Sequence, residues 1–515
     1  MTAAMKRHGR RVSDRPLTHL ESTPGAGFAM LIGGEWVDTK HARHFACCDP
    51  FTEAQWGRVP LADADDVDAA VRAARAAFEG GEWPRLLAAD RARLLLRLAD
   101  LIDRDVEHLA RQQVFENGKL ITEMRAVTAA LAADCRFVAG LAEVHGGDTV
   151  PSTRPNFTTY VLREPIGVVA AITPWNTPLT LLGWKLFPAL AAGNTVVIKP
   201  SEVTPTSTLM LASLAVEAGF PRGAINVVTG YGEPAGTALV RHPHVEKIAF
   251  TGSTSTGQRI AVEAAKRSAA VSLEMGGKSA NIIFADADID NAVNGVMAGV
   301  FAATGQSCVA GSRVLVEASV YDRVAELLVE RARKMIIGDP LDPATQLGPL
   351  ASRAQLEKVT QYFEIARTEG LELLTGGRQI ERTGFFVEPT VYGNVPNDCR
   401  IAQEEIFGPV VALMPFRAEE EAVRIANATR YGLAAAAWTE DYRRQQRLIA
   451  QLRAGTVWIN NYRIVGHTLP FGGYKQSGVG REMGRRALEA YSETKSVWID
   501  IGNRVAFPVG KGKDE

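Results

Sequence analysis

Val168-Val169-Ala170-Ala171-Ile172 is a continuous apolar run, typical of a strand that is buried on both faces of a sheet. The β-branched run Thr195-Val196-Val197-Ile198 predicts the next strand, and 225–228 and 247–250 continue the series. Helical patterns fill the intervals, one of them from Thr206 to Ala218. Strands and helices that alternate over short links predict a parallel sheet covered by helices. We therefore expect an α/β fold with a doubly wound sheet.

Polar or glycine-containing segments follow three of these strands. They are Thr173-Pro174-Trp175-Asn176, Lys199-Pro200-Ser201-Glu202 and the stretch 251–257, which precedes a helix. Small residues at a helix N-terminus suit a phosphate, although ordinary turn chemistry accounts for the last segment equally well. Lys199 and Glu202 would bind the two hydroxyls of an adenine ribose, and the carboxylate would repel a 2′-phosphate. This pattern favours NAD over NADP.

Two further positions carry candidate chemistry. Cys308 lies in Gly305-Gln306-Ser307-Cys308, ahead of the apolar run Val314-Leu315-Val316. A thiol on a turn flanked by glycines is open to a substrate and to backbone amides, whereas the alternative is a buried structural cysteine. Glu274 stands between an apolar strand and a Gly-Gly turn, where a partly desolvated carboxylate acts as a base or forms a structural ion pair.

The assembled motifs resemble those of the NAD(P)-dependent aldehyde dehydrogenases of the hydrolytic, non-acylating type. The match includes Asn176 in Pro-Trp-Asn, Lys199 and Glu202 in Lys-Pro-Ser-Glu, Gly252-Ser253-Thr254, Glu274 in Leu-Glu-Met-Gly-Gly-Lys, Cys308 in Gly-Gln-Ser-Cys, 404–410 and 470–478. These motifs occur in the family's order and spacing, and the resemblance extends from about Ala29 to Val505. It implies a Rossmann-like NAD-binding domain, an α/β catalytic domain and a small β oligomerisation ribbon.

The resemblance also implies a mechanism. Cys308 would attack the aldehyde carbonyl, and the Asn176 amide with the Cys308 backbone N–H would hold the oxyanion. Hydride would leave for the nicotinamide, and Glu274 would activate the water that hydrolyses the thioester. The catalytic set is Cys308, Glu274, Asn176 and Lys199. The expected NAD contacts are Thr173, Pro174, Trp175, Lys199, Ser201, Glu202, Gly232, Gly252, Ser253, Thr256, Glu405 and Phe407.

The substrate pocket is less well determined by the sequence. Its expected lining is Thr177, Leu181, Trp184, Ala302, Ser307, Val309 and Val465. Many family members have aromatic residues where this chain has Thr177, Val465 and Ala302, so we expect a wider pocket for a bulkier aldehyde. Arg463 and His467 either bind an acidic substrate or are solvated loop residues, and solvation is the commoner case.

The expected domain boundaries follow from the same resemblance. Residues 28–146 and 166–275 form the NAD-binding domain, 276–485 the catalytic domain, and 147–165 with 486–505 the oligomerisation segments. Residues 1–27 form a basic disordered arm, for which an organellar transit segment is the weaker alternative, and 506–515 form a tail. An exposed strand edge in the ribbon predicts a homodimer or homotetramer.

Helical spacing in the first domain predicts a helix that begins after Asp63 or Asp65. It predicts two long helices as well, from Asp90 to about Gln112 and from Ile121 to about Val144.

Composition excludes several classes of partner. Lys+Arg 57 against Asp+Glu 58 gives a net charge of -1, which attracts neither nucleic acid nor a membrane surface. The five scattered cysteines form no disulfide or metal pattern, and they fit a reducing, cytoplasmic location. A CoA-acylating enzyme of the same superfamily remains an alternative, although those enzymes generally lack the glutamate that matches Glu274. A non-catalytic protein with the same fold is a further alternative, and the presence of Cys308, Glu274 and Asn176 together argues against it.

Overall fold

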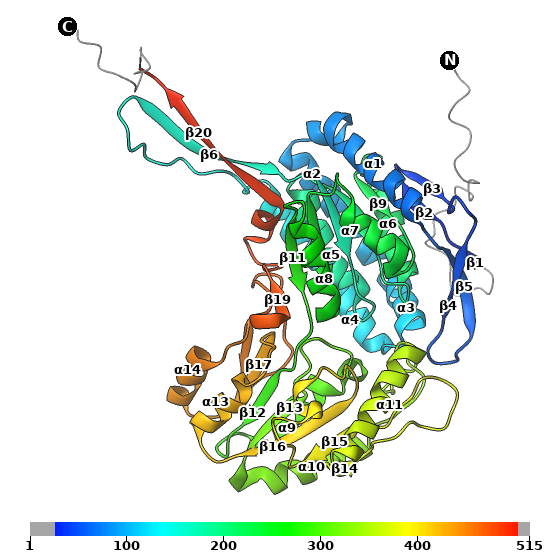
Figure 1. The fold of residues 1–515 in the computed structure, drawn as a ribbon, viewed down its shortest axis with the longest axis vertical. Helices are drawn as coiled ribbons and strands as arrows, with labels where there is room; N and C mark the ends of the chain where they lie inside the picture. Colours follow the sequence, from blue (N-terminus) through cyan, green and yellow to red (C-terminus); the bar gives the residue numbers. More distant parts are fainter. Residues whose placement is uncertain (1–25, 503–515) are drawn as a thin grey trace.

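The computed structural model describes residues 26–502, in which the strands form sheets of eight, seven, three and two strands (Figure 1). The expected tail at 506–515, and all but the last two residues of the expected arm, lie outside the described residues. The two large sheets belong to two lobes, and the two-stranded ribbon projects away from both of them (Figure 1).

The eight-stranded sheet contains every strand that the sequence predicts between 168 and 274. Its order is β19-β11-β10-β7-β8-β9-β2-β3, and the five strands from β11 to β9 are parallel. The strands are β2 (Met30–Ile32), β3 (Glu35–Val37), β7 (Val168–Ile172), β8 (Thr195–Lys199), β9 (Ile225–Val227), β10 (Lys247–Thr251), β11 (Ala270–Glu274) and β19 (Gly478–Val479). The predicted doubly wound sheet is therefore confirmed.

Alternate residues of β7 pack into different hydrophobic clusters, which shows that both faces of this sheet are covered. Val169 joins one cluster, with residues of α2, α5 and α6, while Val168 joins another, with residues of α1 and α8. The helices of this lobe are α1 (Ala64–Gly80), α2 (Ala88–Arg104), α3 (Val106–Asn117), α4 (Ile121–Ala142), α5 (Pro178–Ala191), α6 (Pro205–Ala218), α7 (Thr237–Arg241) and α8 (Thr254–Ala265). Asp63 caps α1 as predicted, because its side chain accepts from the backbone N–H groups of Asp65 and Asp66.

The helix expected from Asp90 to about Gln112 is wrong in one respect. The chain forms two helices there, α2 and α3, with Asp105 between them in a non-helical conformation. Arg104 donates two hydrogen bonds to the Asp105 carboxylate, and this pairing of neighbouring side chains accompanies the break. The helix expected from Ile121 is confirmed as α4.

The seven-stranded sheet forms the second lobe, in the order β14-β15-β16-β13-β12-β17-β18. It is parallel except at β14, and its strands are β12 (Ala280–Ile283), β13 (Arg313–Glu317), β14 (Glu372–Thr375), β15 (Thr390–Gly393), β16 (Val410–Phe416), β17 (Ala434–Trp438) and β18 (Thr456–Ile459). Its helices are α9 (Ile289–Val300), α10 (Tyr321–Arg333), α11 (Arg353–Thr368), α12 (Arg400–Gln403), α13 (Glu419–Asn427) and α14 (Tyr442–Gln451). Cys308 lies between α9 and β13, at the helix-to-strand connection that the sequence indicates.

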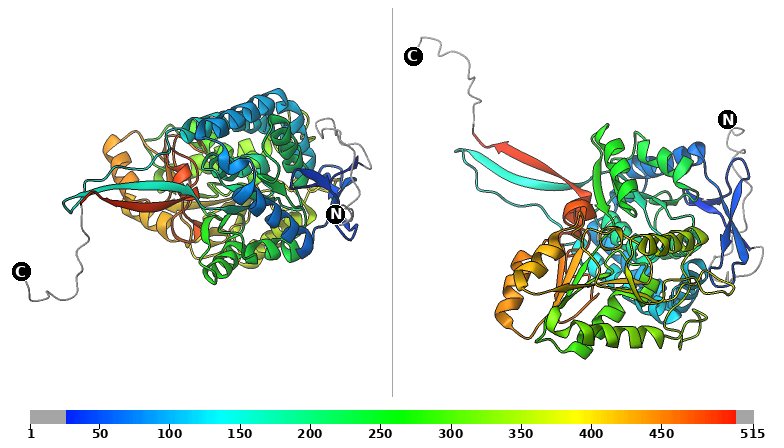
Figure 2. Two further views of the ribbon diagram at one scale, coloured as in Figure 1. Left: turned by 90° about the horizontal axis from the view of Figure 1, so that it is seen from above. Right: turned by 60° about the horizontal axis from the view of Figure 1, so that its bottom comes forward.

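Two smaller sheets complete the fold. β6 (Phe157–Pro165) and β20 (Ser492–Asp500) pair over nine residues as an antiparallel ribbon, which extends well beyond the body in two views (Figures 1 and 2). β1 (Ala26–Gly27), β4 (His44–Cys48) and β5 (Gln55–Pro60) form the three-stranded sheet. β19 follows the second lobe in the sequence but pairs with β11 of the first, so the chain returns to the cofactor sheet near its end.

Candidate active site

The Cys308 loop has an unusual backbone. Ala303, Thr304 and Gly305 all have positive φ angles, of 55°, 54° and 71°. A Cβ at Gly305 would collide with the backbone of Gly408, so glycine is required there on two counts. Left-handed non-glycine residues are costly and are concentrated at functional sites, which singles out this loop.

Asn176 approaches the same loop from the cofactor lobe. It follows β7, is 5% exposed, and donates from Nδ2 to the backbone oxygen of Gln306 at 3.0 Å. Gln306 is two residues before Cys308, so the fold brings Asn176 close to the residue that it is expected to assist. Thr177, the next residue, continues into the N-terminus of α5.

A cavity of about 430 Å³ opens beside Cys308, within the range of ordinary small-molecule sites. Much of its wall is apolar, with aromatic side chains from Trp184, Tyr462 and Phe471. Of the seven predicted pocket residues, the structure places Thr177, Leu181, Trp184, Ser307, Val309 and Val465 in this wall. Ala302 is not among the lining residues, since it lies on the short helical turn that leads into the loop.

The charged residues on the rim of the cavity form pairs. Arg463 lies 3.7 Å from a Glu123 carboxylate oxygen, and His467 lies 3.3 Å from Asp134. The two side chains, Arg463 and His467, that the sequence offered for an acidic substrate therefore already have carboxylate partners. The structure favours the structural interpretation of both residues.

Cys308 is partly accessible, and its surroundings oppose ionisation. Burial raises the pKa of its thiol to about 12, and the negative charges of Glu405 and Glu274 act in the same direction. The ammonium of Lys119, which lines the same cavity, lowers this pKa. Because the thiolate is the reactive form, charges near the sulfur control its nucleophilicity.

Glu274 ends β11 and is 2% exposed. Neither carboxylate oxygen has a hydrogen-bond partner among residues 26–502. Burial, followed by the charge of Glu482, raises the pKa of this carboxyl well above its usual range. Gly472 leaves room for the carboxylate, since a Cβ there would lie 2.7 Å from Oε1. A buried carboxyl with no internal partner and a raised pKa is suited to accept a proton.

A buried ion pair beside Glu274 was not anticipated from the sequence. Lys185 Nζ donates to Glu482 Oε1 at 2.6 Å and to Thr251 Oγ1 at 2.6 Å, and both charged side chains are almost fully buried. The two partners are 297 positions apart, so no local pattern links them. Lys185 lowers the pKa of Glu274 while Glu482 raises it.

The predicted cofactor residues lie largely at the carboxyl edge of the eight-stranded sheet. Lys199 ends β8, is 3% exposed, and donates to Pro200 O, while burial lowers its pKa to about 8. Ser201 and Glu202 follow it, with Ser201 Oγ 3.4 Å from Glu202 Oε2. Beyond β10, Ser253 caps α8 by accepting from Thr256 N. This helix N-terminus, next to Gly252, is a suitable place for a phosphate group.

Residues after β7 and residues of the second lobe between α12 and β16 also fit a dinucleotide. Thr173 Oγ1 is buried and lacks a partner within residues 26–502, which leaves a donor for a ligand. Glu405 accepts from Gly277 N at 3.0 Å, and burial raises its pKa. Phe407, which has a φ of 63°, packs edge-on against Trp175 with ring centroids 5.2 Å apart. Of the remaining expected contacts, Pro174 immediately follows Thr173, and Gly232 begins the turn before α7.

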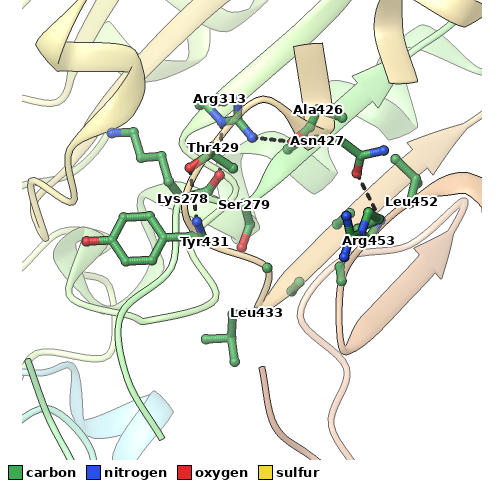
Figure 3. A pocket seen from close by; sticks show the side chains of 15 residues that line it. Lys278, Ser279, Arg313, Ala426, Asn427, Thr429, Tyr431, Leu433, Leu452 and Arg453 are labelled. Atoms are coloured by element: carbon green, nitrogen blue, oxygen red, sulfur yellow. Dashed lines mark hydrogen bonds between the residues drawn. The ribbon is translucent and has the colours of Figure 1, made fainter. Parts of the chain in front are cut away.

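A second cavity lies between β12, β13 and β17 and is shown in Figure 3. Its volume is about 10 Å³, enough for roughly one water molecule and too small for a substrate. Arg313 is directed toward Ala426, whereas the Lys278 side chain extends away from Asn427 and Arg453 (Figure 3). The cavity beside Cys308 is therefore the better substrate site of the two.

Two kinds of feature are absent from the described residues, a membrane-spanning helix and a metal-binding cluster. Within residues 26–502, no helix is long and apolar enough to cross a membrane. The same residues contain no group of three or more His, Cys, Asp or Glu side chains that could hold a metal ion.

Comparison with known proteins gives a consistent result. The model of the aldehyde dehydrogenase family matches residues 36–497. An aldehyde dehydrogenase of Emericella nidulans is 45% identical over 476 residues, covering 92% of this chain and 95% of that protein. Retinal dehydrogenase 2 of Mus musculus is 46% identical over 480 residues, 92% of each. The NAD+ complex of an aldehyde dehydrogenase from Bacillus cereus has a TM-score of 0.91 at 44% identity, covering 93% of this chain and 97% of that chain.

Proposed function

The chain belongs to the aldehyde dehydrogenase family and oxidises an aldehyde to the carboxylic acid with NAD; from this premise we propose that Cys308 is the nucleophile and Glu274 the base. The observation that carries this assignment is the meeting of Cys308, the Asn176 amide and the cavity at one point, with Glu274 acting electrostatically on the sulfur.

The first step is addition to the carbonyl. The Cys308 thiolate forms a C–S bond, and the carbonyl π electrons move to oxygen, which becomes an oxyanion. Asn176 Nδ2 and the Cys308 backbone N–H donate to this oxygen, and the loss of one such donor typically costs about 10²–10³ in rate. Asn176 exchanges its bond to Gln306 O for the oxyanion as the substrate binds.

The second stage returns the enzyme to its free form. NAD, when bound, would supply the hydride acceptor. As the hydride leaves the carbon attached to Cys308, the oxyanion electrons re-form the C=O bond and that carbon becomes a thioester. Glu274 takes a proton from water, the resulting hydroxide adds to the thioester carbon, and the C–S bond breaks to release the acid and the thiolate. The raised pKa of Glu274 makes it a stronger base than an exposed carboxylate.

We assign the adenosine and pyrophosphate of NAD to the segments that follow β8 and β10 at the carboxyl edge of the eight-stranded sheet. Lys199 and Glu202 bind the adenine ribose, and Ser253 with Thr256 lies at the helix N-terminus that receives the phosphates. Glu405 binds the nicotinamide ribose, and Phe407 packs beside it. The Glu202 carboxylate favours NAD, so kcat/KM should be higher with NAD than with NADP.

We propose a bulky, weakly polar aldehyde as substrate. Thr177 and Val465 leave the cavity wider than aromatic residues would, and Arg463 and His467 are paired with carboxylates. An acidic substrate would have to displace those partners.

The ribbon of β6 and β20 supports a proposal of self-association as a homodimer or homotetramer. It exposes Leu162, Trp498, Ile499 and Ile501, which favours burial against a second copy. We propose the domain boundaries that the sequence predicts. We also propose a cytoplasmic location, which the five free cysteines support.

The deciding experiment is NADH formation from NAD with aliphatic, aromatic and carboxylated aldehydes, with and without CoA. Turnover without CoA, highest for bulky uncharged aldehydes, is the expected result. Activity only with CoA would assign the chain to the acylating class, and preference for carboxylated aldehydes would overturn the substrate proposal.

A further inference from the structure

A short turn between α3 and α4 reaches the catalytic cavity and has no role in the mechanism so far. α3 ends at Gly118, which has a φ of 70° and lies against Pro349, where a Cβ would lie 2.6 Å from Cγ. Lys119 follows, is 3% exposed, and lines the cavity that contains Cys308. Its backbone N–H donates to Asn117 Oδ1 at 3.0 Å, so the turn is internally fixed.

Two hydrogen bonds join this turn to the residues on either side of Asn176. Asn117 Nδ2 donates to the backbone oxygen of Trp175 at 3.2 Å, and Lys119 Nζ donates to Thr177 Oγ1 at 3.1 Å. The oxyanion donor is therefore held from both of its neighbours by one turn. Since a displacement of about 1 Å in such a donor costs much of its effect, these contacts bear on the rate of addition.

The charge of Lys119 also acts on the sulfur. Burial lowers the Lys119 pKa to about 8, Glu123 and Cys308 raise it, and Arg463 lowers it. Among the charges that act on Cys308, Glu405 and Glu274 oppose the thiolate and Lys119 supports it. Tyr462 also interacts electrostatically with Cys308, and burial raises the pKa of its hydroxyl.

Within residues 26–502 the ammonium has one hydrogen-bond acceptor, Thr177, which leaves two N–H groups of Lys119 for the cavity. A merely structural lysine would satisfy its donors internally or extend to solvent, and Lys119 does neither.

We propose that Lys119 is a positioning residue of the nucleophilic centre, which rests on the roles assigned above to Cys308 and Asn176. It fixes the segment 175–177 that carries the oxyanion donor, and it places a positive charge in the cavity of the sulfur that must become anionic. Thr177 is the contact through which the first effect is transmitted.

The test is the pH dependence of Cys308 alkylation by iodoacetamide in the full-length enzyme without NAD, with the modified peptide identified by mass spectrometry. We expect Lys119→Met to shift the profile to higher pH and to slow alkylation at pH 7 by about three- to tenfold, because each tenfold loss of thiolate lowers the rate proportionally. Lys119→Arg should restore the profile, since it keeps the charge. Lys334→Met, which removes an exposed lysine on α10, is the matched control and should leave it unchanged.

A second variant separates the positioning of Asn176 from the effect of the Lys119 charge on the Cys308 thiol. Thr177→Val removes the acceptor but keeps the ammonium, so kcat should fall while the alkylation profile stays in place. It also keeps the test decisive if Lys119→Met fails to fold. An unchanged alkylation profile in folded Lys119→Met, or unchanged kcat in Thr177→Val, would overturn the proposal. Loss of NADH formation on alkylation of wild-type Cys308 tests the nucleophile independently, so either assignment can fail alone.

Discussion

The cavity beside Cys308 and the small cavity beside Arg313 both contain buried charge, but they satisfy it differently. Arg313 donates to the backbone oxygens of Lys278, Ile425 and Ala426 at 2.9, 3.0 and 2.7 Å. Glu274 does not line the first cavity but acts electrostatically on Cys308, which does, and it has no donor for either carboxylate oxygen within residues 26–502. A buried charge with a full set of internal partners stabilises the fold, whereas one without them is available to a water or a substrate.

The largest effect should come from the nucleophile. Cys308→Ser is expected to lower kcat by at least about 10³-fold, because an unactivated hydroxyl replaces a thiol that ionises more readily. Steady-state NADH formation measures this. Cys48→Ser changes an exposed cysteine and is the matched control. Substantial turnover by Cys308→Ser would show that Cys308 is not the nucleophile.

Glu274→Gln should separate the two chemical stages. The amide keeps the size of the side chain but cannot accept the proton from water, so hydrolysis should slow by about 10²–10⁴-fold. Rapid mixing should then show one NADH per active site followed by a stall. Glu330→Gln, on the surface of α10, is the control. Normal steady-state turnover would show that another group is the base.

Arg313→Met should lower the stability of the fold rather than the catalytic rate. It leaves three buried carbonyl oxygens without their donor, so the free energy of unfolding should fall by about 2–5 kcal/mol. Urea denaturation measures the loss, and kcat per folded molecule should change less than about threefold. If kcat fell strongly while stability was retained, Arg313 would belong with the catalytic groups.

The smallest expected change is a shift in pH dependence. The negative charge of Glu482 raises the pKa of Glu274, so Glu482→Gln should lower that pKa. Because the base must be deprotonated, the acid limb of the kcat profile should move to lower pH. The single-turnover rate of thioester hydrolysis across a pH series is the measurement. A shift to higher pH would show that the Glu482 charge does not raise the pKa of Glu274.

Local signals in the sequence predicted much of the fold and the reactive residues. Strands such as β7 are apolar because both of their faces are buried, and the polar segments after them occupy the ligand edge that a parallel sheet creates. Cys308, Asn176 and Glu274 were predicted as reactive residues because motif and position agree.

What the sequence did not provide depends on contacts between distant residues. Lys185 meets Glu482, and Lys119 meets Thr177, only in the folded chain. The pairing of Arg463 with Glu123 of α4 could not be read from the sequence around either residue, and it argues against the acidic-substrate alternative. The break at Asp105 interrupts a continuous helical pattern, and periodicity alone does not register it.

β19 has a consequence for the order in which the molecule assembles. Gly478 pairs with Glu274, so one strand of the cofactor sheet comes from a segment that leaves the ribosome after all the strands of the second lobe. The parallel strands can collapse earlier, since their connections are short. A nascent chain that stops before residue 478 would lack both β19 and Glu482, and Glu274 would face water. Glu274 thus reaches its final surroundings only after Cys308 has been synthesised.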